Sequence, residues 1–90
     1  MKITFDSKKN TDNVTKHKLS LAEAAFLDWS NALIWPDRRH DYGEDRQAAL
    51  VPMNQRLYFA AFVDRKTVRR IISLRKANMR EFDYYEQEIN

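Results

Sequence analysis

The first third of the chain alternates short apolar and polar stretches in a way that predicts one short strand followed by two helices. Residues 3–5 are predicted to form the opening strand, and residues 8–17 a helix. Ser20 and Glu23 have the spacing of a capping box, in which each side chain accepts a hydrogen bond from the other residue's backbone N–H. This box predicts a second helix from Leu21 to Asp28.

From residue 32 onward the pattern is typical of strands joined by turns. Strands are predicted at residues 32–35 and 46–51, each closed by a following proline. Residues 57–63 are apolar at both odd and even positions, which indicates a central strand covered on both faces. The side chains of residues 68–75 are expected to point alternately to the two sides of a strand. One face has Val68, Arg70, Ile72 and Leu74, and the other has Arg69, Ile71, Ser73 and Arg75.

The last segment is predicted to be a helix that begins after a second capping box, formed by Asn78 and Glu81. Its apolar stripe is expected to pack onto the sheet and consists of Met79, Phe82, Tyr85 and Ile89. Helices segregated from a run of strands predict one α+β domain over residues 1–90. We expect an antiparallel sheet of three to four main strands, packed with two N-terminal helices and one C-terminal helix.

Composition narrows the class of protein. The chain has 90 residues and 43% apolar residues, enough for one small core, and it has no cysteine. The absence of cysteine excludes disulfides, Cys-ligated metals and thiol catalysis, and it suits a reducing compartment. No apolar run approaches the roughly 20 residues of a membrane-spanning helix, and the first residues lack a signal peptide's apolar region. We therefore expect a cytoplasmic protein without a membrane segment.

Positive charge is concentrated in one segment. The formal net charge is only +3, yet residues 65–80 carry seven Lys and Arg residues and no acidic residue. A basic segment inside a folded domain favours a polyanionic partner, most simply a nucleic acid. The alternative is a solvated strand face whose charge is balanced by acidic residues elsewhere in the fold.

Several short motifs, in this order, resemble the BrnT family of bacterial type II toxins. The motifs are residues 2–6, Asn13 with Lys16 and His17, residues 19–24, residues 41–46, and residues 70–77 with Glu81 and Tyr85. The resemblance implies a RelE-like fold and an endoribonuclease that inhibits translation without a metal or other cofactor. It also implies a BrnA-like ribbon-helix-helix antitoxin as partner in a hetero-oligomer, with operator DNA bound only through that complex.

The residues expected to act in RNA cleavage are mostly arginines. A guanidinium donates two hydrogen bonds to a phosphate and stays protonated, which suits the charge that develops on the phosphorane. Four arginines match positions that recur in the family and are predicted to be catalytic: Arg46, Arg65, Arg70 and Arg75. Arg75, at a strand end, is expected to be exposed. Arg70 could instead be a structural residue paired with Glu44 or Glu81.

Two further side chains could move protons, and others could bind RNA. His17 is the candidate general base, although a histidine at a helix end is more often a capping or packing residue. Tyr84 could donate a proton or stack on a base. Tyr85, on the apolar stripe, is expected in the core. The predicted RNA-binding residues are Lys16, Lys66, Arg69, Lys76 and Arg80.

Other chemistries do not fit the sequence. His40, Asp41, Glu44 and Asp45 lie close together, but their spacing matches no zinc, calcium or two-metal signature. A single glycine excludes glycine-rich phosphate loops and Gly-x-Ser-x-Gly nucleophile motifs. Two alternatives to a ribonuclease stay open. One is a non-enzymatic toxin or binding module that grips its target with the same basic face, as ParE-like relatives of the fold act on gyrase. The other is a structural domain.

Overall fold

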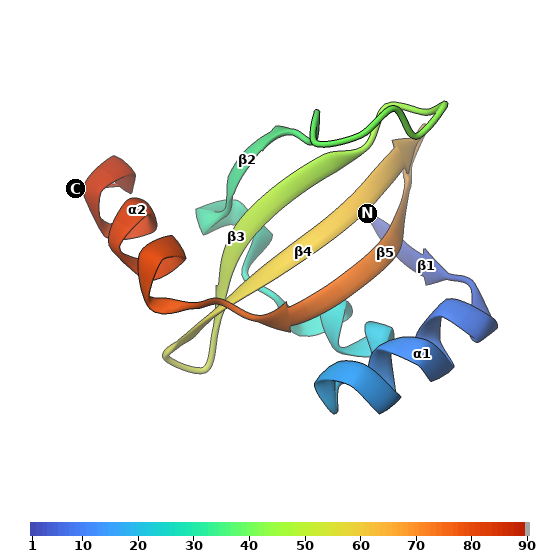
Figure 1. Ribbon diagram of the computed structural model, residues 1–90, viewed down its shortest axis with the longest axis horizontal. Coiled ribbons are helices and arrows are strands. Elements are labelled where there is room, and N and C mark those ends of the chain that lie inside the picture. The colour runs from blue at the N-terminus through green and yellow to red at the C-terminus, as the bar shows by residue number, and fades with distance from the viewer. Residues whose placement is uncertain (90) are drawn as a thin grey trace.

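The computed structural model describes residues 1–89, which form a five-stranded sheet with helices at its edge, on one face and at one end (Figure 1). In chain order the elements are β1 (Lys2–Phe5), α1 (Ser7–His17), the 3₁₀ helices η1 (Leu21–Phe26) and η2 (Trp29–Asn31), β2 (Leu33–Pro36), β3 (Gln47–Met53), β4 (Arg56–Arg65), β5 (Val68–Lys76) and α2 (Met79–Ile89). None of the helices in the described part of the chain is long and apolar enough to cross a membrane.

The strands lie in the order β1-β5-β4-β3-β2, so the α+β class is confirmed. The prediction of an antiparallel sheet with three to four main strands needs correction. The sheet has five strands and is mixed, because β1 runs parallel to β5 while the other neighbours are antiparallel. β4 lies at its centre, as its apolar residues predict, and Phe59, Ala60, Ala61, Phe62 and Val63 are all buried.

The two faces of the sheet carry separate cores. On the face that we call the η face, Phe62, Ile71 and Leu74 pack with Leu21 and Ala24 of η1. On the opposite face, which we call the loop face, Phe59 and Ala61 of β4 pack with Tyr85 of α2. A domain with helices over one face alone would expose the second core, which residues 37–46 help to cover through the contact of Arg39 with Phe59.

A β-bulge in β5 alters the predicted alternation of its side chains. Ala61 pairs with Ser73 and Phe62 with Ile71, so Ile72 is an extra residue without a partner of its own on β4. An extra residue shifts the alternation by one position. The sequence-based grouping is therefore wrong beyond the bulge: Leu74 lies on the η face, while Ser73 and Arg75 lie on the loop face with Arg70.

The side chain of Asn13 completes the sheet where β1 ends. β1 pairs with β5 only as far as Ile71. Beyond that point the Asn13 amide donates to the carbonyl oxygen of Leu74 (Nδ2 to O, 2.8 Å) and accepts from its N–H (N to Oδ1, 3.1 Å). The same Nδ2 also donates to the carbonyl oxygen of Leu19 (2.9 Å). Asn13 is 5% exposed, so these bonds form away from water. They dock α1 against the edge of β5.

Helix boundaries differ from the prediction where a distant residue takes part. The first predicted helix is confirmed as α1, with Asp6 as its N-cap. The second is shorter than predicted and is a 3₁₀ helix, and its capping box does not form: the Ser20 hydroxyl accepts from Ala22, not from Glu23. Asn10 of α1 accepts the Leu21 N–H instead (2.7 Å). Ser20 thus remains the N-cap of η1, while Asn10 of α1 binds the first N–H of this helix.

At the C-terminal end the Asn78 and Glu81 capping box is confirmed, with both reciprocal bonds present (2.8 and 2.9 Å). The prediction that the apolar stripe of α2 packs on the sheet is wrong except at Tyr85, which is buried and donates its hydroxyl to the carbonyl oxygen of Asn31. The other three residues are exposed because α2 projects beyond the end of the sheet (Figure 1).

Pro52 lies inside β3 instead of ending it. β2 pairs with β3 only as far as Leu50, so Pro52 stands where that side of β3 has no strand beside it and its missing N–H costs no bond to β2. The following turn places Asn54 and Gln55 at positive φ, as two-residue hairpin turns require.

Replacing Asn13 with Ala is expected to destabilise the fold by about 3 kcal/mol, because it leaves a buried N–H and a buried C=O of Leu74 without partners. Chemical denaturation measures the loss. Thr15→Ala, an exposed change on the same helix, is the control and should shift the free energy of unfolding by less than about 0.5 kcal/mol. Equal stabilities for the two variants would contradict the role given to Asn13.

Candidate functional site

The loop of residues 37–46 folds back toward the loop face of the sheet. Its two ends are joined by a hydrogen bond from the Asp37 N–H to the Arg46 carbonyl oxygen (2.8 Å). The Asp37 side chain is 1% exposed and accepts two bonds from Arg39, each 2.8 Å long. Arg39 in turn lies over the ring of Phe59, 5.5 Å from its centroid. The loop is thus anchored to the sheet by one buried carboxylate and one arginine.

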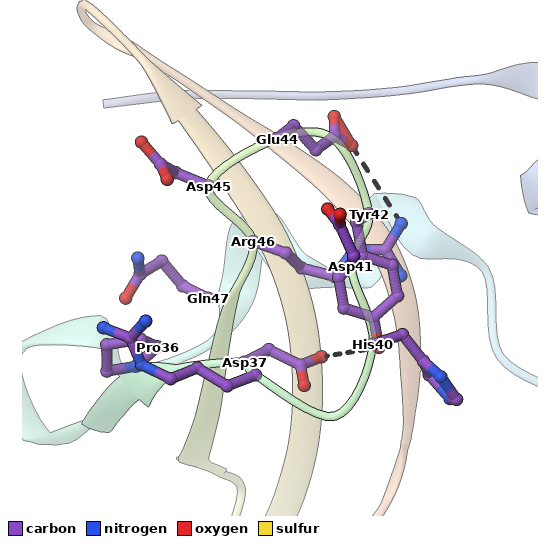
Figure 2. A pocket seen from close by; sticks show the side chains of 10 residues that line it. Pro36, Asp37, His40, Asp41, Tyr42, Glu44, Asp45, Arg46 and Gln47 are labelled. Atoms are coloured by element: carbon purple, nitrogen blue, oxygen red, sulfur yellow. Dashed lines mark hydrogen bonds and ion pairs between the residues drawn. The ribbon is translucent and has the colours of Figure 1, made fainter.

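Polar side chains of this loop surround an open hollow of about 420 Å³ (Figure 2). Tyr42 donates to Asp37 (3.4 Å), and the Arg46 guanidinium stacks 3.7 Å above the Tyr42 ring. Arg46 also approaches Glu44 at 4.0 Å, while its buried Nε has no hydrogen-bond partner. Arg46 is therefore held by an aromatic face more than by a carboxylate.

Arg70 and Arg75 point from β5 to the loop face, and each meets a carboxylate. Arg70 contacts Glu44 (3.2 Å), one of the two partners that the sequence suggested. Arg75 forms a two-pronged ion pair with Glu81, with both bonds 2.8 Å long, and lies 4.4 Å from the Phe59 ring centroid. Arg75 was expected to be exposed at a strand end, but its side chain is only 29% exposed, because Glu81 and Phe59 cover it.

His17 lies at the end of α1, beside the bulge in β5. It borders a small hollow with Lys16, Ile72 and Ser73. Partial burial, followed by the positive charges of Lys16 and Arg75, lowers the pKa of His17 below its usual value of 6.5. The imidazole is therefore neutral near pH 7, which is the form that accepts a proton. His17 and Ser73 border the same hollow, and Ser73 lies on the loop face with Arg75.

Tyr84 belongs to a row of aromatic rings that leads to Arg75. Its ring meets that of Trp35 edge-on, with centroids 6.1 Å apart, and Trp35 meets Phe59 in the same way at 6.3 Å. Tyr84 is 45% exposed, so its hydroxyl is open to solvent. Tyr85 lies in the core, as expected.

The remaining predicted residues do not join this cluster. Arg65 and Lys66 are exposed at the turn between β4 and β5, at the far end of the hairpin from Arg75. Arg75 lies seven positions after Val68 on β5, roughly 20 Å away at about 3.3 Å per residue. One phosphate therefore cannot reach both ends. Lys16, Lys76 and Arg80 are exposed around α1, the end of β5 and the start of α2.

Arg69 lies on the opposite face from the other arginines, which corrects its predicted grouping with Arg75. Its side chain is 11% exposed and makes a two-pronged ion pair with Asp64 (2.7 and 2.9 Å). It also stacks near the rings of Trp29 and Phe62 on the η face. These contacts give Arg69 a packing role and leave it little surface for a ligand.

Sequence reasoning missed Asp37, Arg39 and Phe59 as members of the site. Asp37 and Arg39 lie in a polar run without hydrophobic periodicity, and Phe59 is one of seven apolar residues at positions 57–63. Among residues 1–89, no group of three or more His, Asp or Glu side chains is arranged to hold a metal ion. His40 meets only the edge of Tyr42 (5.7 Å between ring centroids).

Comparison with known proteins identifies the family. A family model described as the ribonuclease toxin BrnT of type II toxin-antitoxin systems matches residues 5–81. The chain belongs to the BrnT family. A BrnT-family crystal structure, that of the ribonuclease toxin BrnT of Brucella abortus at 1.1 Å resolution, matches with a TM-score of 0.71 and 26% identity, over 88% of this chain and 99% of that one. No curated protein sequence matches the chain at a significant level.

The match to the BrnT family covers most of the site. Residues 5–81 include His17, the loop of residues 37–46, the arginines of β5 and Glu81, whereas Tyr84 lies just beyond them. The resemblance noted from short motifs is therefore confirmed at the level of the family. The roles of single residues are not decided by the match, and they are proposed below from the geometry.

In this BrnT-family chain the pairing of Glu81 with Arg75 is expected to make stability depend on pH. Hydrogen bonds from Arg75 lower the pKa of Glu81 in the folded state. A depressed carboxyl pKa stabilises the fold above the unfolded pKa and loses that effect as the pH falls through the folded pKa. Wild type should therefore lose more stability than Glu81→Gln between about pH 6 and pH 3. Urea denaturation of both proteins at pH 6 and at pH 3 measures the two losses of stability. Equal losses for wild type and Glu81→Gln would contradict this prediction.

Proposed function

We propose that the protein is a metal-independent endoribonuclease that cleaves RNA and thereby inhibits translation. The observation that carries the proposal is the placement of Arg70 and Arg75 on the loop face of β5, with His17 bordering a hollow beside Ser73 of that face. Membership of a ribonuclease toxin family supports the same activity. Two components are sufficient for cleavage through the 2′-hydroxyl without a metal: side chains that bind the phosphate, and a neutral histidine that accepts a proton.

In the proposed reaction His17 takes the proton of the ribose 2′-hydroxyl, whose oxygen then attacks the adjacent phosphorus. The P–O bond to the 5′-oxygen breaks, and Tyr84 supplies a proton to that leaving oxygen. The products are a 2′,3′-cyclic phosphate and a free 5′-hydroxyl. Arg75 donates hydrogen bonds to the phosphorane, where negative charge develops, and this contribution is the largest of the three.

The rest of the basic surface is proposed to hold the RNA strand. Arg65 and Lys66 at the turn, Arg70 and Arg46 in the middle, and Lys16, Lys76 and Arg80 at the other end follow the length of the β4–β5 hairpin. Because the cations are spread over this length, they suit successive phosphates of one strand better than a single phosphate. We leave Arg69 out of this set, since it is paired on the η face.

We further propose a BrnA-like ribbon-helix-helix antitoxin in the cytoplasm as partner. Membership of a type II toxin-antitoxin family supports an antitoxin. An acidic segment of that partner would complement the basic surface, and the hetero-oligomer would bind operator DNA through the antitoxin alone. Binding to the folded toxin would also stabilise it by mass action.

RNA cleavage in the presence of EDTA tests the metal-independent reaction. Purified wild-type protein should cleave RNA with chelator present, and Arg75→Lys should lower the rate by about 10² to 10³-fold, because a lysine cannot reproduce the two-pronged donation. Arg56→Ala, which removes one exposed positive charge at the turn between β3 and β4, is the control. Folded wild-type protein that cleaves no RNA would instead favour a non-enzymatic toxin that binds its target through the same face.

The pH dependence of cleavage tests His17. Since the pKa of His17 is lowered below 6.5, the neutral base predominates at pH 7 and is protonated as the pH falls below 6.5. The acid limb of the profile of kcat/KM against pH should therefore lie below 6.5 and disappear in His17→Gln, whose residual rate should vary little in that range. An unchanged acid limb in His17→Gln would remove the histidine from the reaction.

A further inference from the structure

We propose that Arg39 is a second phosphate-binding residue of the site, which donates to the same RNA phosphate as Arg75. The inference rests on the proposed ribonuclease function and adds a residue outside the basic segment. Arg39 reaches the site from the loop of residues 37–46, whereas Arg75 reaches it from β5, and both guanidinium groups approach the ring of Phe59 (5.5 and 4.4 Å).

The first support is the way in which Asp37 holds Arg39. The carboxylate is 1% exposed and accepts from Nε and Nη2 of Arg39. These two hydrogen bonds fix the orientation of the guanidinium plane of Arg39. Nη1 makes no hydrogen bond to any described residue, and 59% of the side chain faces solvent. A fixed, exposed, permanently charged donor is what phosphate recognition requires, because little rotamer freedom is left to lose on binding.

The second support is the neighbourhood of Arg75. The positive charge of Arg39 contributes to the lowered pKa of Glu81, the carboxylate that holds Arg75, so the two arginines lie in one electrostatic environment. Each is held by its own acid: Asp37 comes from the loop and Glu81 from α2. The Phe59 ring between them is apolar and offers no competing hydrogen bond. Two preorganised donors facing one apolar floor match the non-bridging oxygens of a phosphodiester.

A simpler explanation is that Arg39 only anchors the loop to the sheet through Asp37. An anchoring residue would affect stability and leave the rate of cleavage by folded protein nearly unchanged. A residue that binds the phosphorane would affect the rate even where stability is retained. The two roles are therefore separable by measuring both quantities on the same variants.

The experiment compares Arg39→Lys and Arg39→Ala with Arg38→Ala. Arg38 is the neighbouring exposed arginine, which borders the hollow of the loop but is not stacked on Phe59, so its variant removes the same charge one position away. Melting temperature, single-turnover cleavage of an RNA oligonucleotide, and binding of the same oligonucleotide with a 2′-deoxy cleavage site are measured for each. Because Arg39→Ala leaves Asp37 unpaired, Asp37→Asn with Arg39→Gln serves as a folded second variant.

If the inference is correct, the Arg39 variants cleave about 10²-fold more slowly and bind the uncleavable RNA up to about tenfold more weakly, whereas Arg38→Ala changes neither quantity by more than about threefold. Cleavage rates of the Arg39 variants within about threefold of Arg38→Ala would overturn the inference while leaving the ribonuclease function intact.

Failure of the ribonuclease function itself is recognised separately, because wild-type protein would then not cleave the RNA. The phosphate site is judged in that case by titration with adenosine 3′-monophosphate, with the fluorescence of Trp35, which borders Phe59, as the signal. Arg39→Lys should weaken this binding by about tenfold relative to Arg38→Ala, and equal affinities would overturn the inference.

Discussion

The structure depends on two hydrogen bonds between the side chain of Asn13 and the main chain of Leu74. β5 extends beyond its neighbour β1, which ends opposite Ile71. An amide is the side chain suited to this place, because it presents one donor and one acceptor to a backbone that offers one of each. A carboxylate or an aliphatic group would leave a buried bond unmade. The contact fixes α1 on the sheet edge, and His17 at its end is thereby brought near Arg75.

The bulge at Ile72 determines which chemistry the strand can present. Without the extra residue, strict alternation would direct Arg75 to the η face, where helices and core side chains leave no room for a phosphate. With it, Arg70, Ser73 and Arg75 share the loop face. Bulges often re-aim a side chain next to a functional site, and this one accounts for both the arginine pair and the hollow beside His17.

The features predicted correctly from sequence are those determined by residues close together in the chain. The central strand follows from apolar residues at both parities of 57–63, and the start of α2 from the spacing of Asn78 and Glu81. Predictions failed where the deciding partner is distant in sequence. The Ser20 and Glu23 capping box does not form, and Asn10 of α1 binds the Leu21 N–H at the start of η1. No periodicity rule detects one extra residue in a strand. Arg39 was missed because a polar loop does not indicate which of its side chains turns inward.

Three arginines on the loop face are each held by a carboxylate: Arg39 by Asp37, Arg70 by Glu44 and Arg75 by Glu81. The local net charge is therefore smaller than the basic segment suggests. In the proposed function, long-range attraction of RNA would rely more on the exposed cations at the two ends of the hairpin. The paired arginines contribute fixed direction instead. A guanidinium already oriented by an acid loses little rotamer entropy when phosphate arrives, and its remaining N–H groups stay available. Attraction and orientation are thus assigned to different residues, so charge alone identified the segment but not the members of the site.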